Sequence, residues 1–129
     1  MLVDTGSNWL WVNSKYCNNC VEAKTKGFDH LTSSTFDAIK KPFVLHYGSG
    51  SVAGLPAFDQ VCLVSRSRDS CTSSEMEFMV VLRQSGLDFL KVQGLIGMTP
   101  TRMEKEADLF IEELYAAGVV DSQVFSIYI

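Results

Sequence analysis

The sequence of 129 residues lacks the features that mark fibrous, disordered or membrane-spanning chains. Proline is scarce, with 3 residues, and the 9 glycines show no repeat, which excludes collagen and low-complexity chains. The most apolar run, Met76–Leu82, is far shorter than the roughly 20 residues of a membrane-spanning helix. Only 11 residues are basic against 15 acidic ones, and they are scattered. We therefore expect no membrane span and no nucleic-acid partner.

What is present is an ordinary globular composition, with 47% apolar and 20% charged residues. This length fits one domain, or one lobe of a larger protein, with a sizeable core. Two close pairs of cysteines favour an oxidising compartment. The N-terminus nevertheless has neither a basic nor an apolar leader region. These two observations conflict, and the conflict suggests that the true N-terminus is missing.

Short apolar or alternating runs between turn residues predict an all-β fold. Phe43, Leu45 and Tyr47 alternate with Val44 and His46, and Gly48–Ser51 then forms the expected tip of a hairpin. His46 is expected to face outward, and the polar segment 13–34 is expected to be a loop. The strands are predicted at residues 2–3, 8–12, 43–47, 52–64, 76–82, 92–98 and 124–129.

One substantial helix is predicted near the C-terminal end. Thr101 and Glu104 have the spacing of a capping box, which would start the helix at Thr101. Apolar residues then recur at helical spacing, and Gly118 is placed to end the helix. The residues that define this spacing are Ala107, Phe110, Ile111, Leu114 and Tyr115.

Asp4-Thr5-Gly6-Ser7 is the most informative segment, because it puts a carboxylate at a tight turn between apolar strands. Hydroxyl groups and turn amides around such a carboxylate can stabilise its charge, which makes Asp4 a candidate acid or base. The alternative is ordinary turn chemistry, since Asp and Gly are both common turn formers. The tetrapeptide alone leaves the two interpretations about even.

Five segments, in order, resemble the pepsin-like aspartic proteases. DTGSNWLWV resembles the first active-site loop of that family, and YGSGSVAG, starting at Tyr47, resembles its substrate-covering flap. The others resemble the segment before the flap, the hydrophobic-hydrophobic-Gly strand, and the closing helix and strand of the N-terminal lobe. They are SSTF (33–36), GLIGM (94–98) and FIEELYAAGVVDSQVFSIYI (110–129).

The resemblance implies that residues 1–129 are a partial N-terminal lobe of a bilobal peptidase, without its first strands and its C-terminal lobe. Asp4 would be one of two catalytic carboxylates. Thr5 and Gly6 would shape its loop, and Ser7 would hydrogen-bond to it. On the flap, the Tyr47 hydroxyl would lie near the indole of Trp11, and the backbone of Gly48 and Ser49 would bind a peptide substrate. Taken without the resemblance, Tyr47 and Trp11 are more simply core aromatics.

The implied activity is an aspartic endopeptidase, in which two carboxylates share one proton. Asp-Thr/Ser-Gly occurs once in the chain, so the second carboxylate is expected in the missing C-terminal lobe, and the fragment alone is expected to be inactive. Two alternatives stay open. One is a non-catalytic pepsin-like binding or inhibitor module, and the other is a retroviral-type homodimer. By family analogy, the protein would be secreted, lysosomal or vacuolar.

Of the three possible disulfide connectivities, we favour Cys17 with Cys20 and Cys62 with Cys71. A redox motif or half of a zinc site is the alternative for the Cys-x-x-Cys pair. Neither His30 nor His46 has ligand spacing, so no metal and no cofactor are predicted. Gln93 departs from the family, which usually has Asp there; this is expected to weaken local hydrogen bonding without touching a catalytic role.

Overall fold

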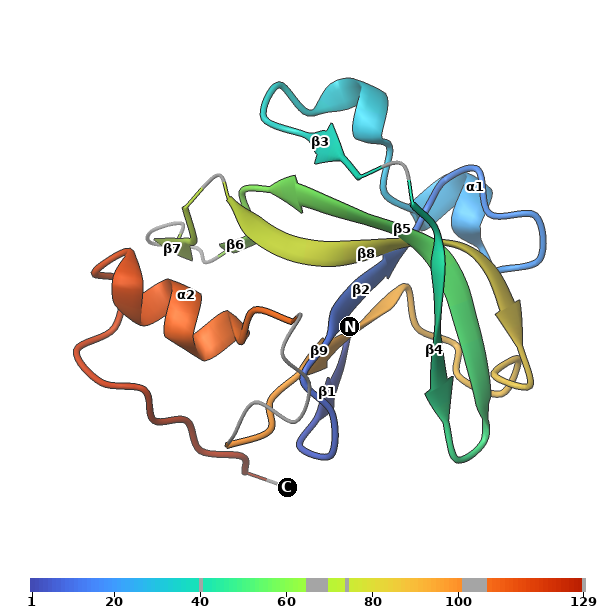
Figure 1. Cartoon of the computed structure of the whole chain (residues 1–129). Coiled ribbons are helices and arrows are strands. Elements are labelled where there is room, and N and C mark those ends of the chain that lie inside the picture. The colour runs from blue at the N-terminus through green and yellow to red at the C-terminus, as the bar shows by residue number, and fades with distance from the viewer. Residues whose placement is uncertain (40, 65–69, 74, 101–106, 129) are drawn as a thin grey trace.

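A computed structural model describes residues 1–39, 41–64, 70–73, 75–100 and 107–128. Strands predominate, and one substantial helix lies near the C-terminal end (Figure 1), which confirms the predicted all-β class. The elements are β1 (Leu2–Asp4), β2 (Leu10–Asn13), α1 (Ala23–Lys26), η1 (His30–Thr32), β3 (Asp37–Ala38), β4 (Phe43–Tyr47), β5 (Gly50–Asp59), β6 (Cys62–Leu63), β7 (Ser70–Cys71), β8 (Met76–Ser85), β9 (Gly94–Gly97) and α2 (Phe110–Ala116).

Within the described residues, seven strands form one mixed sheet in the order β1-β9-β2-β8-β5-β3, and β4 pairs with β5. Strand β9 is parallel to β1 and antiparallel to β2, so it lies between two strands that follow each other in the chain. The loop from β1 to β2 therefore has to cross the end of β9. A separate pair, β6 and β7, places Cys62 opposite Cys71.

Strand β9 approaches its neighbours so closely that two of its positions leave no room for a side chain. A Cβ atom at Gly97 would lie 2.5 Å from the carbonyl carbon of Asn8 and 2.7 Å from the nitrogen of Trp9. At Gly94, a Cβ atom would overlap the carbonyl oxygen of Trp11. Both obstacles are backbone atoms, which cannot move aside as a flexible side chain can. The Gly-Leu-Ile-Gly sequence is thus a steric requirement of this strand order.

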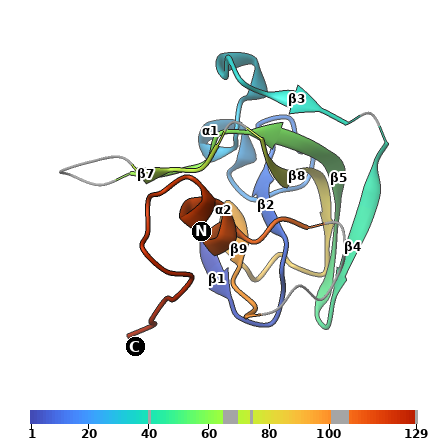
Figure 2. The same cartoon turned by 60° about the vertical axis from the view of Figure 1, so that its left-hand side comes forward.

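Two apolar clusters cover the two faces of the central strands. Alternate residues of β8 serve both: Met79 and Val81 belong to the cluster on the hairpin side, and Phe78 and Val80 to the cluster under α2. This alternation is the period of two that a strand imposes. Figure 2 shows α2 on one side of the central strands and the β4–β5 hairpin on the other. Both faces of the central strands are thereby buried, and β5 of the hairpin is paired with the central strand β8.

The helix is shorter than the sequence predicted. It begins at Phe110, after Leu109 in an extended conformation without a side-chain cap, and the expected capping box of Thr101 and Glu104 lies outside the described residues. The Asp108 carboxylate accepts a hydrogen bond from the Glu77 amide at 3.1 Å. This contact ties the segment before the helix to β8. Gly118, at a φ of +69°, follows the end of the helix as expected.

The predicted last strand, residues 124–129, is wrong for the part that the structure describes. Val124, Ile127 and Tyr128 are 74%, 51% and 101% exposed, and the segment forms no ladder with the described strands. A strand needs a hydrogen-bonding neighbour, and no described strand lies beside this segment to supply one.

The predicted loop 13–34 is also wrong in part, because it contains two short helices. Glu22 precedes α1 at a φ of +53°, and the side chain of Asp29 accepts the Leu31 amide at the start of η1. Residues 52–64 divide as well, since β5 ends at Asp59 and β6 is separate. No helix among the described residues has the length and apolar character to cross a bilayer.

We predict that Gly97→Ala lowers the free energy of unfolding by about 1–3 kcal/mol, because β9 would have to move away from the loop. Equilibrium urea unfolding measures this change. Gly48→Ala is the matched control, since a Cβ atom at Gly48 would meet nothing within 4 Å. An equal loss in both variants would contradict the steric explanation.

Lys15 and Asp29 form an ion pair, with 2.8 Å between Nζ and Oδ2, in the segment that follows β2. The hydrogen bond from Lys15 lowers the pKa of the Asp29 carboxyl, and the same contact raises the pKa of Lys15. The carboxyl contribution to stability is present above the unfolded pKa of about 3.9 and is lost as the pH falls through the folded value. The lysine contribution is present below about pH 10.4 and is lost as the pH rises through its folded pKa.

We therefore predict that Lys15→Met moves the pKa of Asp29 back toward its ordinary value in an NMR pH titration. Lys26→Met is the control, because it breaks the separate Lys26–Glu22 pair. An unchanged Asp29 pKa in Lys15→Met would refute this attribution.

Candidate active site

The loop between β1 and β2 is held in place by the chain that leaves β9. The Met98 amide donates to the Asp4 carbonyl at 2.7 Å, and the Thr99 amide donates to the Ser7 carbonyl at 3.1 Å. The Gly97 amide donates to the Trp9 carbonyl at 3.0 Å. The loop is thus bonded at both ends and in its middle. Backbone hydrogen bonds therefore hold this loop to the end of β9 and the residues that follow it.

Within this loop, two neighbours orient the carboxylate of Asp4. The Ser7 hydroxyl donates to Oδ2 at 2.6 Å, and the Gly6 amide donates to Oδ1 at 3.0 Å. Asp4 is partly buried, whereas Thr5 is exposed. Among the described residues, neither recorded ion pair involves Asp4. The carboxylate is therefore oriented by its neighbours in the loop, and no cation of the described residues forms an ion pair with it.

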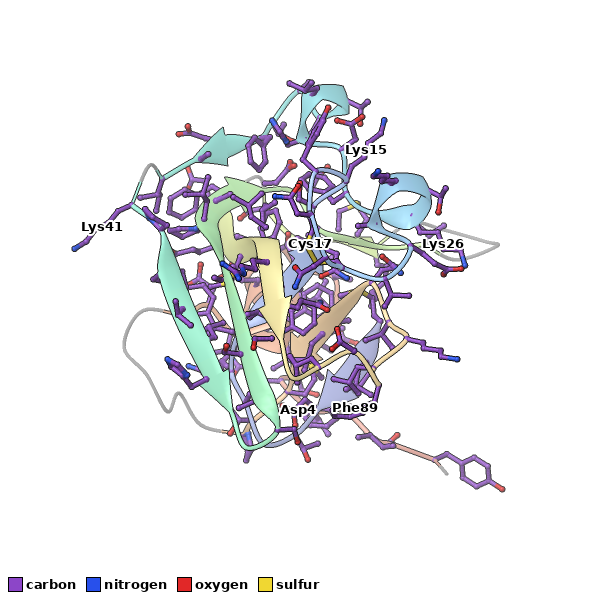
Figure 3. The ribbon with its side chains drawn as sticks, turned by 90° about the vertical axis from the view of Figure 1, so that its right-hand side faces the viewer. Asp4, Lys15, Cys17, Lys26, Lys41 and Phe89 are labelled. Carbon is purple, nitrogen blue, oxygen red and sulfur yellow. A yellow bond between two sulfur atoms is a disulfide. The ribbon has the colours of Figure 1, made fainter. Side chains whose placement is uncertain are left out.

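The β4–β5 hairpin extends at the same end of the molecule as this loop. Figures 1 and 2 both place the hairpin tip and the β1–β2 loop there, and Figure 3 shows Asp4 at that end. Two contacts tie the hairpin to β2 and the residues before it. Trp11 donates its indole N–H to the Tyr47 hydroxyl at 3.0 Å, and the rings of Trp9 and Phe43 lie 4.8 Å apart.

A hollow of about 240 Å³ separates the loop from the first hairpin strand. Its lining includes Ser7, whose hydroxyl binds Asp4, and Tyr47, which binds Trp11. His46 is exposed on this strand, as expected from the alternation. The hollow therefore lies between the first hairpin strand and the loop that carries Asp4.

A second hollow, of about 290 Å³, lies between β2, β8 and α2, and its lining is mostly apolar. The carboxylate in its lining belongs to Asp59, which accepts hydrogen bonds from the hydroxyls of Ser33 and Thr35 and from the Gln60 amide. These bonds tie segment 33–36 to the end of β5. They give Asp59 a structural role that is separate from the Asp4 loop.

The cysteines lie in two disulfides, Cys17–Cys20 and Cys62–Cys71, which is the connectivity favoured from the sequence. With both Cys17 and Cys20 oxidised, neither thiol is free in this structure. Gln93 donates to the Val21 carbonyl at 2.9 Å, but its Oε1 is buried and has no hydrogen-bond partner among the described residues. Gln93 therefore leaves one polar atom unsatisfied, away from the carboxylate of Asp4.

The sequence did not reveal the residues whose backbone amides hold the β1–β2 loop in place. The amides of Met98 and Thr99 bond to the loop, but backbone groups carry no signal in a sequence. The available signal was the pair of glycines at 94 and 97. A glycine inside an apolar strand run indicates close approach of another backbone.

The whole chain is similar in sequence to known proteins. The family model described as eukaryotic aspartyl protease matches residues 1–129. Gastricsin from Homo sapiens is 31% identical over 132 aligned residues, which cover 100% of this chain and 33% of that protein. Pepsin A from Sus scrofa and pregnancy-associated glycoprotein 4 from Ovis aries are each 30% identical, again over 100% of this chain and 33% of theirs.

The chain belongs to the eukaryotic aspartyl protease family. The strands and the one substantial helix of the described part of the chain are those of an all-β, pepsin-like N-terminal lobe. It spans about a third of the length of the curated relatives that it matches.

We predict that Tyr47→Phe lowers the free energy of unfolding by about 1–3 kcal/mol, because the buried Trp11 N–H loses its acceptor. Trp11→Phe combined with Tyr47→Phe should lose less than the sum of the two single changes. Urea unfolding of the single and double variants measures this coupling. Fully additive losses would show that the hydrogen bond does not stabilise the hairpin.

Proposed function

We propose that the chain supplies the first catalytic carboxylate, Asp4, of an aspartic endopeptidase. The supporting observation is the placement of this carboxylate: Ser7 and Gly6 orient it, and the hairpin that carries Tyr47 extends at the same end of the molecule. Thr5 and Gly6 shape the loop. Trp11 supports the flap, and the Gly48 and Ser49 backbone binds an extended peptide substrate.

The proposed reaction needs a second carboxylate. One carboxylate of the pair takes a proton from a water molecule, and the oxygen of that water attacks the carbonyl carbon of the peptide. The other, protonated, carboxyl donates its proton to the carbonyl oxygen. Two carboxyl groups held close together share one proton, because both cannot ionise at once. The carboxyl group that took the proton from water then donates it to the peptide nitrogen, and the other carboxylate takes back a proton from a hydroxyl group on the tetrahedral carbon. The C–N bond breaks, the amine leaves, and the carbon reforms a carbonyl.

The second Asp-Thr/Ser-Gly is absent from these 129 residues. We place it in the C-terminal lobe of the same polypeptide, with residues 1–129 as a partial N-terminal lobe. The match of the whole chain to about a third of each relative supports this division. A search of the coding sequence for a second such motif between apolar strands tests it directly.

We further infer a secreted, lysosomal or vacuolar setting. The two disulfides support it, because disulfides persist in oxidising compartments. A shared proton also requires that the carboxyl pair be partly protonated, which favours activity at acidic pH.

We predict that the full-length protein cleaves a denatured protein substrate at about pH 4, where a carboxyl pair can hold one proton. Pepstatin should block the cleavage, and Asp4→Asn should lower kcat by at least roughly 10³-fold. A fluorogenic peptide assay measures both effects. Asp121→Asn is the matched control, because Asp121 is exposed beyond α2.

Retained activity in Asp4→Asn would remove this residue from the mechanism. Sedimentation and the same assay on residues 1–129 alone separate the alternatives. A pepstatin-sensitive dimer would indicate the retroviral-type arrangement. A full-length protein that binds peptide without cleaving it would indicate a binding module.

A further inference from the structure

The first residue of β5, Gly50, packs against the backbone of Ser85 and Gly86 at the end of β8. A Cβ atom at Gly50 would overlap the Ser85 carbonyl oxygen and lie 2.9 Å from the Gly86 carbonyl carbon. In the reverse direction, a Cβ atom at Gly86 would lie 2.7 Å from the Ser49 carbonyl oxygen and 3.2 Å from the Gly50 Cα. The contact is between backbones, and a methyl group on either glycine would force them apart.

Gly86 also has a conformation that other residues adopt at a cost. Its φ is +71°, in the left-handed region, where the chain leaves β8 for the turn at Leu87–Leu90. The next residue, Leu87, is 3% exposed and belongs to the same apolar cluster as Trp11. Tyr47 packs against this cluster. The turn under the hairpin is therefore anchored in the core.

A polar network holds the end of β8 from the other side. The Asn19 side chain donates to the Gln84 carbonyl at 2.6 Å and accepts from the Gln84 amide at 3.1 Å. The Gln84 side chain donates to Asn13 Oδ1 at 2.7 Å. Asn19 lies within the loop closed by the Cys17–Cys20 disulfide. Two residues before Gly86, the strand is thus fixed to a covalently closed loop.

We propose that Gly86 is a positioning residue that sets the distance between the flap and the loop of Asp4. Its backbone limits how closely the Ser49–Gly50 backbone can approach the end of β8. A methyl group at position 86 pushes that backbone outward and opens the space in which a peptide is gripped. The role in catalysis rests on the proposed function, but the mechanical contact does not.

The test compares Gly86→Ala with Gly118→Ala in the full-length protein. Gly118 is the matched control, because its φ is +69° and a Cβ atom there would meet nothing within 4 Å. Both variants place alanine in the left-handed region, and only Gly86→Ala displaces the flap. We expect Gly86→Ala to raise KM by about tenfold while kcat changes less than about threefold, as for lost substrate binding. Gly118→Ala should leave both constants near wild type.

Hydrogen exchange at the amides of residues 48–51 provides a readout that does not need activity. We expect faster exchange there in Gly86→Ala and wild-type exchange in Gly118→Ala. Should Gly86→Ala not fold, Asn19→Ala removes the support of β8 without a steric clash, and it should also speed exchange at 48–51. Unchanged flap exchange in the variant that folds, or equal changes in Gly118→Ala, would overturn the proposal.

The two proposals fail in different ways. If the wild-type protein cleaves no peptide, the proposed function fails, and the exchange comparison still tests the backbone contact at Gly86. If cleavage is normal and Gly86→Ala changes neither KM nor flap exchange, the peptidase proposal stands and the positioning role is removed.

Discussion

The passage of β9 between β1 and β2 is the constraint on which the rest of the structure depends. Because β9 separates two consecutive strands, the loop that joins them must cross its end, and the backbone groups after β9 bond to that loop. Gly94 and Gly97 make the approach possible, since side chains there would meet backbone. The place of Asp4 is therefore set by main-chain geometry, and only the direction of its carboxylate is left to Ser7 and Gly6. A bulkier residue at Gly94 or Gly97 would therefore push β9 away from β2 and the loop before it.

Strand β2 carries this constraint to the hairpin. It begins just after the Asp4 loop, pairs with β9 and β8, and presents Trp11 to Tyr47. The same strand thus supports the carboxylate and one side of the flap. The other side of the flap rests on the turn after β8, which is buried through Leu87. Between these supports, a Cβ atom built at Gly48 would meet no described atom within 4 Å. In the proposed function, a hairpin supported in this way would cover a bound peptide and open again to release it.

Several strands and the hairpin could be predicted because short apolar runs and the Gly-rich tip carry local signals. The Asp4 turn could also be found from its residues. The order of the strands could not, since nothing in Leu2–Asp4 or Gly94–Gly97 states that the two segments pair. Local sequence patterns predicted the wrong structure where contacts with distant segments determine the conformation. Residues 107–109 look helical, but Asp108 is bonded to β8, and residues 124–128 look like a strand but have no described neighbour with which to pair.

In the proposed pair, Asp4 is one of two carboxyl groups that take different roles. Both of its recorded contacts are donated to it, by a hydroxyl and by an amide, so it acts as an acceptor in each. In the proposed reaction, one carboxyl group takes a proton from water while another donates a proton to the carbonyl oxygen. One carboxyl group cannot fill both roles at the same time, so the proposed function requires a second carboxyl group beside Asp4.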